Sequence, residues 1–201
     1  MSAPEIEPLA SPATSTPWVP LWPLAGSGGG AAAYGTTLPA SPVDGQEAIL
    51  VDSLTNPSYQ WRFRYNALSA SAYKWEFVGG TPRLGFEATS VGPAAGAPTY
   101  LGPLFTVPRA GEYRVTLQCD WGGDPGGASG GNIGLIQPSV NGAALGSSAN
   151  SALALFGAST ANIEQMIPIP ASGSVGIMVY CTVAAVANTN RRVNIVPVRV
   201  A

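Results

Sequence analysis

Apolar and polar side chains alternate one by one over much of this chain, which is the period of a β-strand with one buried face. The clearest runs have apolar residues at Tyr59, Trp61, Phe63 and Tyr65, and at Tyr113, Val115, Leu117 and Cys119. Further strands are expected over 47–52, 73–77, 104–108, 133–140, 153–156, 163–169, 174–186 and 193–200. Turn signals such as Asn141–Gly142 separate these runs. The pattern therefore predicts an all-β protein.

The spacing of the predicted strands divides residues 34–201 into two units. Residues 34–82 predict a small antiparallel meander. Its alternating aromatic side chains are expected to form a core rather than a platform that stacks sugars or bases, because so small a sheet has little else to bury. Residues 83–201 carry a strand about every 10 to 15 residues with turn signals between them, which predicts a β-sandwich.

Residues 1–33 have no strand or helix pattern and are expected to form an extended docking arm. Six prolines between Pro4 and Pro23 forbid a helix and favour polyproline-like geometry. The glycine-rich stretch 25–31 then indicates a flexible hinge. The arm also contains an apolar cluster, which consists of Trp18, Val19, Leu21 and Trp22. Because tryptophan is frequent in binding hot spots, we expect this cluster to dock on a partner or a neighbouring copy. The alternative is that both tryptophans fold back onto their own subunit.

Charged residues are scarce. They make up 10% of the 201 residues, against about 25% in typical soluble domains, while 46% of the chain is hydrophobic. Such a surface suits a protein that is covered by copies of itself or by a larger assembly. The net charge of −2 argues against nucleic-acid binding, and the adjacent Arg191 and Arg192 are expected in a solvated turn. We find no apolar run of membrane-spanning length and no secretion signal, so we expect no membrane partner and folding in a cytoplasm.

The absence of histidine removes the commonest general base and the commonest metal ligand. The remaining enzymatic candidate is a pair of carboxylates, as glycosidases use. It would be drawn from Glu112, Asp120, Asp124 and Glu164. Asp120 and Asp124 stand in a glycine-rich stretch that is ordinary turn composition, and this stretch lacks the oxygen donors of a calcium loop. We therefore expect no catalytic residue, no metal and no cofactor.

The two cysteines, Cys119 and Cys181, fall on the apolar faces of their predicted strands. If those strands were neighbours, a disulfide would be geometrically possible. A protein that assembles in a cytoplasm would keep both thiols reduced. We therefore expect two buried free thiols that act as small hydrophobic side chains.

Four stretches of the meander resemble a module of virion proteins from tailed phages that infect actinobacteria. They are Tyr34–Pro39, Asp44–Ala48, Asn56–Tyr65 and Tyr73–Gly79, spread over roughly a quarter of the chain. The resemblance implies a component of a phage particle, and it indicates this more clearly than which part of the particle.

The sandwich carries a second resemblance. Phe105–Pro108 followed by Gly111–Val115 resembles the start of the jelly-roll domain shared by complement-type and tumour-necrosis-factor-like proteins, and Ser139–Gly142 is similar to a short hairpin of that family. In that fold an edge strand, a glycine turn and a tyrosine-bearing core strand follow one another. The resemblance implies a C-terminal jelly-roll-like β-sandwich and a homotrimer with an apolar threefold axis.

Together these features predict a non-enzymatic phage virion structural protein. We expect a trimeric capsid decoration protein that is assembled in the host cytoplasm and located in the virion. Its arm would attach it to the major capsid protein or another virion component. One rival is a minor tail or fibre-tip protein that binds a host surface glycan, and another is a polysaccharide-degrading tail enzyme. The chain lacks the long coiled coil or repeat shaft that a fibre requires.

Overall fold

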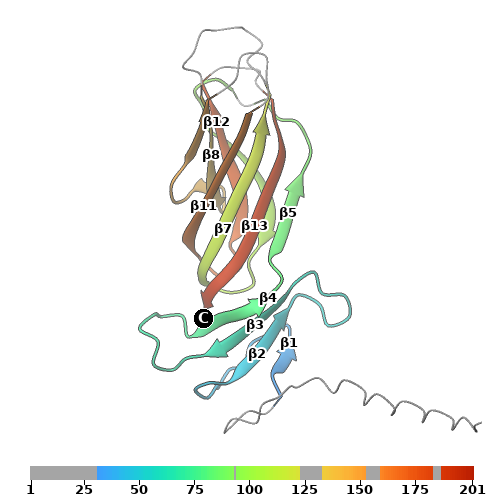
Figure 1. Ribbon diagram of the computed structural model, residues 1–201, viewed down its shortest axis with the longest axis vertical. Helices are drawn as coiled ribbons and strands as arrows, with labels where there is room; N and C mark the ends of the chain where they lie inside the picture. The colour runs from blue at the N-terminus through green and yellow to red at the C-terminus, as the bar shows by residue number, and fades with distance from the viewer. Residues whose placement is uncertain (1–30, 93, 123–132, 153–158, 183–186) are drawn as a thin grey trace, which may run out of the picture.

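The computed structural model describes residues 31–92, 94–122, 133–152, 159–182 and 187–201 (Figure 1). Within these ranges every regular element is a β-strand, which confirms the predicted all-β class. The strands are β1 (Ala33–Gly35), β2 (Glu47–Val51), β3 (Gln60–Tyr65), β4 (Trp75–Gly80), β5 (Arg83–Glu87), β6 (Thr99–Thr106), β7 (Gly111–Trp121), β8 (Ile133–Val140), β9 (Ala143–Ala144), β10 (Ala149–Ala152), β11 (Ser159–Ile169), β12 (Ser174–Cys181) and β13 (Asn188–Val200).

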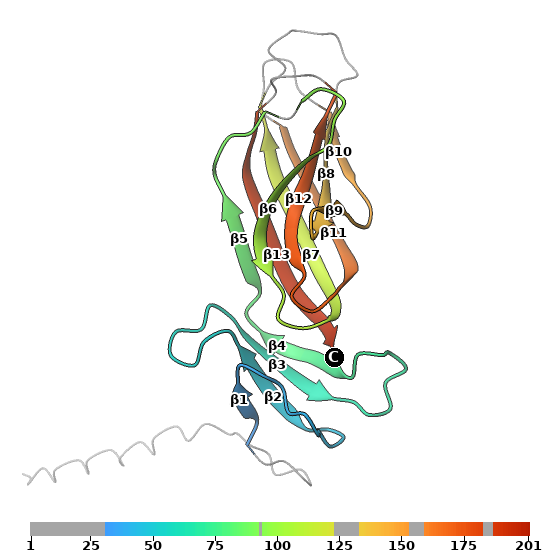
Figure 2. The ribbon, with the colours of Figure 1, turned by 180° about the vertical axis from the view of Figure 1, so that it is seen from behind.

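Strands from β5 onward form a sandwich of two facing sheets. One sheet has the order β5-β13-β7-β11, and the other has the order β10-β8-β12-β6, with antiparallel pairing throughout. Figure 2 shows the second sheet from behind, with β6 and β12 in front of β7 and β13. Counted in chain order without the two-residue β9, the sheets read 1-8-3-6 and 5-4-7-2. This is the strand order of a jelly roll, so the predicted jelly-roll-like sandwich is confirmed.

Aliphatic side chains fill most of the space between the two sheets. Every second residue of β7 is buried from Tyr113 onward, as the alternation predicted, and Val115 and Leu117 are fully buried. They face Ile177 of the opposite sheet and lie beside Ile195 of β13 in one continuous core. Branched aliphatic side chains suit this space because two pleated faces interdigitate about 10 Å apart.

The meander lies below the sandwich and continues the sheet that contains β13 (Figure 1). Strands β2, β3 and β4 pair antiparallel, and the short β1 adds a parallel edge to β2. The end of β13 pairs with β4 through Arg199 opposite Glu76 and Val200 opposite Trp75. The C-terminus therefore ends where the two units meet (Figure 1).

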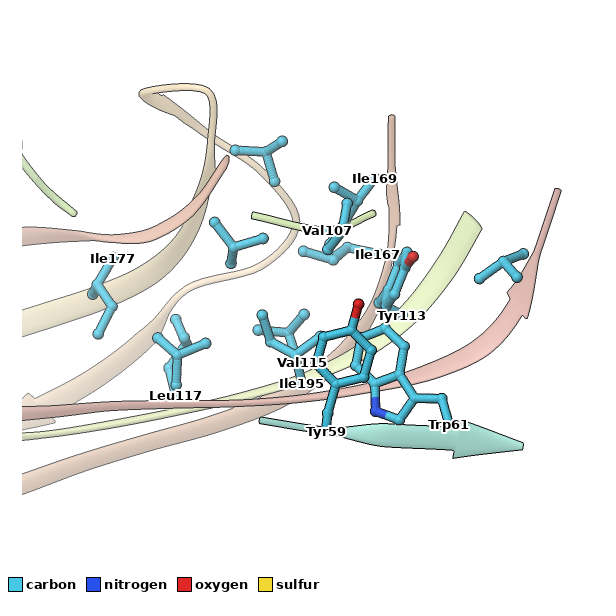
Figure 3. Packing of buried hydrophobic residues seen from close by; sticks show 14 of the residues in the cluster. Tyr59, Trp61, Val107, Tyr113, Val115, Leu117, Ile167, Ile169, Ile177 and Ile195 are labelled. Carbon is cyan, nitrogen blue, oxygen red and sulfur yellow. The ribbon is translucent and has the colours of Figure 1, made fainter. Parts of the chain in front are cut away.

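The aromatic side chains of β3 and its neighbours form the junction between the meander and the sandwich. They were predicted to be buried, and Tyr59, Trp61 and Phe63 are at most 4% exposed. Figure 3 shows Tyr59 and Trp61 against Tyr113 of the sandwich. The Trp61 ring lies 6.2 Å from that of Tyr113 and 6.1 Å from that of Phe105. The inner face of the meander is thus covered by the base of the sandwich.

The sequence pattern missed four strands, β1, β5, β9 and β10, and misplaced the ends of others. Strand β1 has only three residues, and β5 alternates exposed Leu84 and Phe86 with a central glycine, so neither forms a clear apolar run. Strand β6 begins five residues before the predicted start at Leu104. The strand predicted over 153–156 lies outside the described residues, as do residues 183–186 of another; β10 stands just before the first of these segments.

Candidate assembly surfaces

The predicted docking residues, Trp18, Val19, Leu21 and Trp22, lie outside the described residues. The first described residue, Ala31, stands two positions before β1, so the arm joins the body of the protein at the outer edge of the meander (Figure 1). Of the described surfaces, the outer face of the meander is therefore nearest in the chain to the predicted docking segment.

That outer face carries a groove of about 660 Å³, which we call the meander groove. It lies over the ends of β2, β3 and β4 that face the 52–59 loop. Its apolar walls come from Ile49, Pro57 and Val78, and the Val78 side chain is 49% exposed. Arg62 lines one side and forms an ion pair with Glu47.

Two adjacent glycines leave the floor of the meander groove without side chains. Gly80 has a φ of +131°, and a Cβ there would lie 2.0 Å from the Gln60 carbonyl oxygen, so only glycine fits. Gly79 differs, because a Cβ at that position would meet nothing within 4 Å. It pairs with Arg62 just beyond a register shift in the β3–β4 ladder, and therefore opens onto the same face. The strand was predicted to end at Phe77, before these glycines, whereas β4 continues through Gly80. The sequence signal for a groove was the position of the glycine pair next to an aromatic strand.

The 52–59 loop at the end of the groove is fixed by Asp52. Its carboxylate accepts a hydrogen bond from the Ser58 backbone amide at 2.7 Å and another from the Ser58 hydroxyl. Slight burial works to raise the pKa of Asp52, but these hydrogen bonds outweigh it and hold the pKa below its ordinary value. Beside it, burial and then the Asp52 charge raise the pKa of Tyr59 to about 12. The lining of the groove therefore includes the uncharged Tyr59 and a loop that the Asp52–Ser58 hydrogen bonds hold in place.

The described members of the carboxylate set do not come together. Glu112 and Asp120 are eight residues apart on β7, which is about 26 Å, and Glu164 is paired with Thr116 midway between them. Glycosidase carboxyl groups lie at most about 9.5 Å apart. Asp120 accepts hydrogen bonds from Thr160 and Asn190, both at 2.9 Å. Asp124 lies outside the described residues.

Arg191 was expected in a solvated turn, and this prediction is wrong. Arg191 lies inside β13 and is 2% exposed, whereas Arg192 is exposed on the outer face of the sheet. The β7–β13 register shifts between Thr189 and Arg192, and Asn190 has a φ of 49°, so a bulge turns Arg191 inward. Its guanidinium donates to the backbone carbonyl of Asn188 at 2.9 Å.

Both cysteines are free and buried, as predicted. They lie on β7 and β12, in opposite sheets of the sandwich. The Asn188 amide donates a hydrogen bond to the Cys119 sulfur at 3.0 Å. Burial raises the pKa of the Cys119 thiol to about 11. This thiol is therefore protonated at neutral pH and a poor nucleophile.

A smaller groove of about 270 Å³ lies on the second sheet of the sandwich. Tyr100, which is 45% exposed, stands beside the polar side chains of Asn141 and Ser174 there. Gly102 and Gly176 line this groove without side chains. Only glycine fits at position 176, because a Cβ there would lie 2.3 Å from the Leu101 carbonyl oxygen.

Among the residues that the structure describes, no three acidic or cysteine side chains gather as metal ligands would. The same part of the chain contains no helix of the length and apolarity that crossing a membrane requires.

No family model matches this chain, and no curated protein does. A search of solved structures finds 29 matching chains. Among them is a chain from the crystal structure of the T13 IBDV viral particle, with a TM-score of 0.42 and 9% identity. The match covers 68% of the present chain and 37% of the viral one. A virus particle protein is thus among the structural neighbours of this chain.

Proposed function

We propose that this chain is a non-enzymatic structural component of a tailed-phage particle. In detail, it is a trimeric capsid decoration protein that is attached by residues 1–33. The observation that carries the proposal is the jelly-roll order of the sandwich strands, because jelly rolls recur in viral capsid domains. The jelly-roll order supports the proposal through the fold alone. The residues of the meander that resemble actinobacteriophage virion proteins support the proposal independently.

The surface supports an assembled rather than a solitary protein. Only 10% of the residues are charged. Several large apolar side chains are exposed, on the loops of the meander and on the sandwich. They include Leu54, Leu68, Leu84, Phe86 and Tyr100. Contact with neighbouring subunits or with the particle would cover such side chains.

The chemistry of the carboxylates supports a protein without enzymatic activity. A glycosidase needs two carboxyl groups within about 10 Å, one of them with a raised pKa. Glu112 instead pairs with Arg199 at 3.5 Å, and Glu164 accepts a hydrogen bond from Thr116. With no histidine in the chain, no other general base of the usual kind is present.

Attachment through the arm would rest on Trp18 and Trp22. Each indole buries roughly 200 Å², which at about 25 cal/mol per Å² gives up to ~10 kcal/mol for the two before ordering is subtracted. The polyproline-like geometry predicted from the six prolines would keep that ordering term small, because a free segment of that geometry is stiff. Three arms on one trimer would make attachment nearly permanent through effective concentration.

The test is attachment to phage particles of a chain that carries Trp18→Ala and Trp22→Ala. We expect occupancy to fall almost to the level of a chain without residues 1–33. The matched control carries Ile6→Ala and Leu9→Ala, which remove two apolar side chains of the arm outside the predicted docking cluster and should leave occupancy unchanged. Full occupancy of the tryptophan variant, measured by quantitative gel of purified particles, would disprove attachment through the arm.

The trimer is tested separately by light scattering at micromolar concentration. The expected mass is that of three 20.4 kDa subunits. A mass of one subunit would contradict the trimer but not the arm.

A second candidate is a minor tail or fibre-tip protein that binds a host surface glycan. The groove beside Tyr100 favours it, because sugars stack on exposed aromatic rings beside hydroxyl and amide groups, and jelly rolls also occur as lectins. The two candidates differ in copy number: a decoration protein is abundant in the particle, whereas a tail-tip protein is present in few copies. Glycan binding that Tyr100→Ala abolishes would favour the second candidate.

A further inference from the structure

The meander groove is an apolar surface that the described part of the chain leaves uncovered. Val78 is half exposed, and Gly79 contributes no side chain to the space in front of it. Tyr34 of β1 is paired with Ile49 and is 48% exposed, so the apolar surface continues toward the strand at which the arm enters. We propose that this groove is the docking site of the chain's own segment Trp18–Trp22, held within the same subunit.

The segment has the chemistry that the groove would bind. A groove of about 660 Å³ is within the ~300–1,000 Å³ range of sites that enclose ligands of modest size. Indole rings pack well on backbone without side chains, which Gly79 and Gly80 provide. The Arg62 guanidinium on the rim presents a planar cation, the kind of group that stacks on an indole face.

The length of the connecting chain favours docking within one subunit. Ten residues separate Trp22 from Ala33, and glycine is frequent among them. A chain of that composition has a root-mean-square span of roughly 17–20 Å. The groove lies two to three strands across the sheet from β1 and about three residues along the strand direction. The distance from β1 to the groove is therefore ~15 Å.

A connection whose typical span matches the distance gives an effective concentration in the millimolar range. This is far above the micromolar concentration of a second copy in solution, so the subunit's own segment occupies the groove. Docking on a particle would then have to displace it, and the apparent affinity of the arm for a particle is reduced by the fraction of arms that are undocked. The groove would thereby keep Trp18 and Trp22 away from other surfaces until assembly. This inference rests on the docking role proposed for the two tryptophans, but its tests need no particle.

Disulfide trapping in the full chain tests the docking directly. Pro23→Cys and Gly79→Cys place thiols beside Trp22 and in the groove, and the native Cys119 and Cys181 are buried and do not compete. Under mild oxidation we expect a disulfide within one chain, formed at a rate independent of protein concentration. The matched control adds Trp18→Ala and Trp22→Ala to the same pair of cysteines, so the tether is unchanged, and should react at least tenfold more slowly.

The outcomes are distinct. Equal rates with and without the tryptophans would show that the segment only collides with the groove, and would overturn the proposal. Disulfide-linked dimers whose formation rises with concentration would place the segment on a second copy, and would overturn docking within one subunit. Neither result depends on attachment to a phage particle, so the proposed function stands or fails separately.

A second measurement uses the native cysteines and fills the groove instead. Gly79→Leu places a side chain in its open space. Trp61, Trp75 and Trp121 are buried, so quenching of fluorescence by iodide reports on Trp18 and Trp22. We expect Gly79→Leu to raise the quenchable fraction and Ala88→Leu, an exposed position on the sandwich side, to leave it unchanged. An unaltered quenchable fraction in Gly79→Leu would overturn the proposal.

Discussion

The meander and the sandwich bury different kinds of side chain. The meander contributes Tyr59, Trp61, Phe63 and Trp75 to the core, whereas the sandwich interior is mainly valine, leucine and isoleucine. A small sheet with one buried face has few positions to fill, and each aromatic side chain buries about 150–250 Å². Two facing sheets, in contrast, have many positions that small branched side chains fill closely. The comparison shows that the meander depends on the sandwich for cover, while the sandwich closes largely on itself.

The first prediction breaks the shared core at the junction. Trp61 is fully buried, its indole donates to the Thr81 carbonyl oxygen at 2.9 Å, and its ring contacts Tyr59, Phe105 and Tyr113. We expect Trp61→Ala to lower the free energy of unfolding by about 3–5 kcal/mol. The control Leu68→Ala removes a side chain that is 90% exposed and should change it by less than ~0.5 kcal/mol.

Denaturant unfolding of Trp61→Ala also tests whether the meander and the sandwich unfold together. Because one core crosses the junction, the aromatic near-ultraviolet signal and the strand signal should be lost together in both the native chain and Trp61→Ala. Loss of the aromatic signal at lower denaturant than the strand signal would mean that the meander unfolds alone.

The second prediction compares glycines of the two units. A Cβ on Gly134 of β8 would lie 2.5 Å from the Trp121 ring, which is fully buried between the sheets. Gly134→Ala should therefore lower the free energy of unfolding by about 1–3 kcal/mol. Gly79→Ala enters open space, and should leave it unchanged or raise it by up to about 1 kcal/mol, since alanine restricts the unfolded chain. Urea unfolding of both variants checks this; equal losses would mean that a methyl group at position 79 meets a neighbour that cannot move aside.

Alternation along single strands was enough to predict the sandwich, because the period of a strand is a local property. Strand β8 begins and ends at the predicted residues, and the Asn141–Gly142 turn after it has positive φ at both positions. The features that the sequence did not show depend on contacts between distant segments. Arg191 turns inward because of a bulge against β7, and β5 is a strand because it pairs with β13.

The candidate surfaces divide in the same way. The apolar cluster around Trp18 and Trp22 was visible in the sequence because such side chains are unusual in a proline-rich segment. The meander groove was not, because it depends on the register shift that brings Gly79 opposite Arg62. A pattern of residue types along one strand carries no information on where a neighbouring strand slips.

The third prediction concerns alkaline pH, where the two units contain different titrating groups. Burial raises the pKa of Cys119 in the sandwich from 9.0 to about 11, and that of Tyr59 in the meander from 10.0 to about 12; the pKa of Tyr113 is raised as well. The folded protein keeps these protons after the unfolded chain has lost them. Stability should therefore be complete below pH ~9 and fall above it, by up to about 1.4 kcal/mol per pH unit for each group.

Urea midpoints between about pH 8 and pH 11 measure this loss. Because the ordinary pKa of a thiol is below that of a phenol, Cys119→Ala should flatten the first part of the decline, between about pH 9 and 10. Tyr59→Phe should flatten only the part above pH ~10. A decline that begins at the same pH in Cys119→Ala as in the native chain would show that the thiol does not cause it.

The smallest expected effect comes from two ion pairs among the described residues, one in each unit. Arg62 of the meander donates to one Glu47 carboxylate oxygen through both Nε and Nη2, whereas Arg199 of the sandwich approaches Glu112 at 3.5 Å. All four side chains are about a third exposed, so solvent screens both pairs. Double-mutant cycles with Glu→Gln and Arg→Gln changes should give a coupling of at most ~1 kcal/mol for the first pair and less for the second, because two hydrogen bonds hold the first geometry. Both couplings should shrink in high salt. A larger coupling for Arg199 with Glu112 would mean that the seam between β13 and β7, rather than the outer face of the meander, carries the stronger electrostatic contribution.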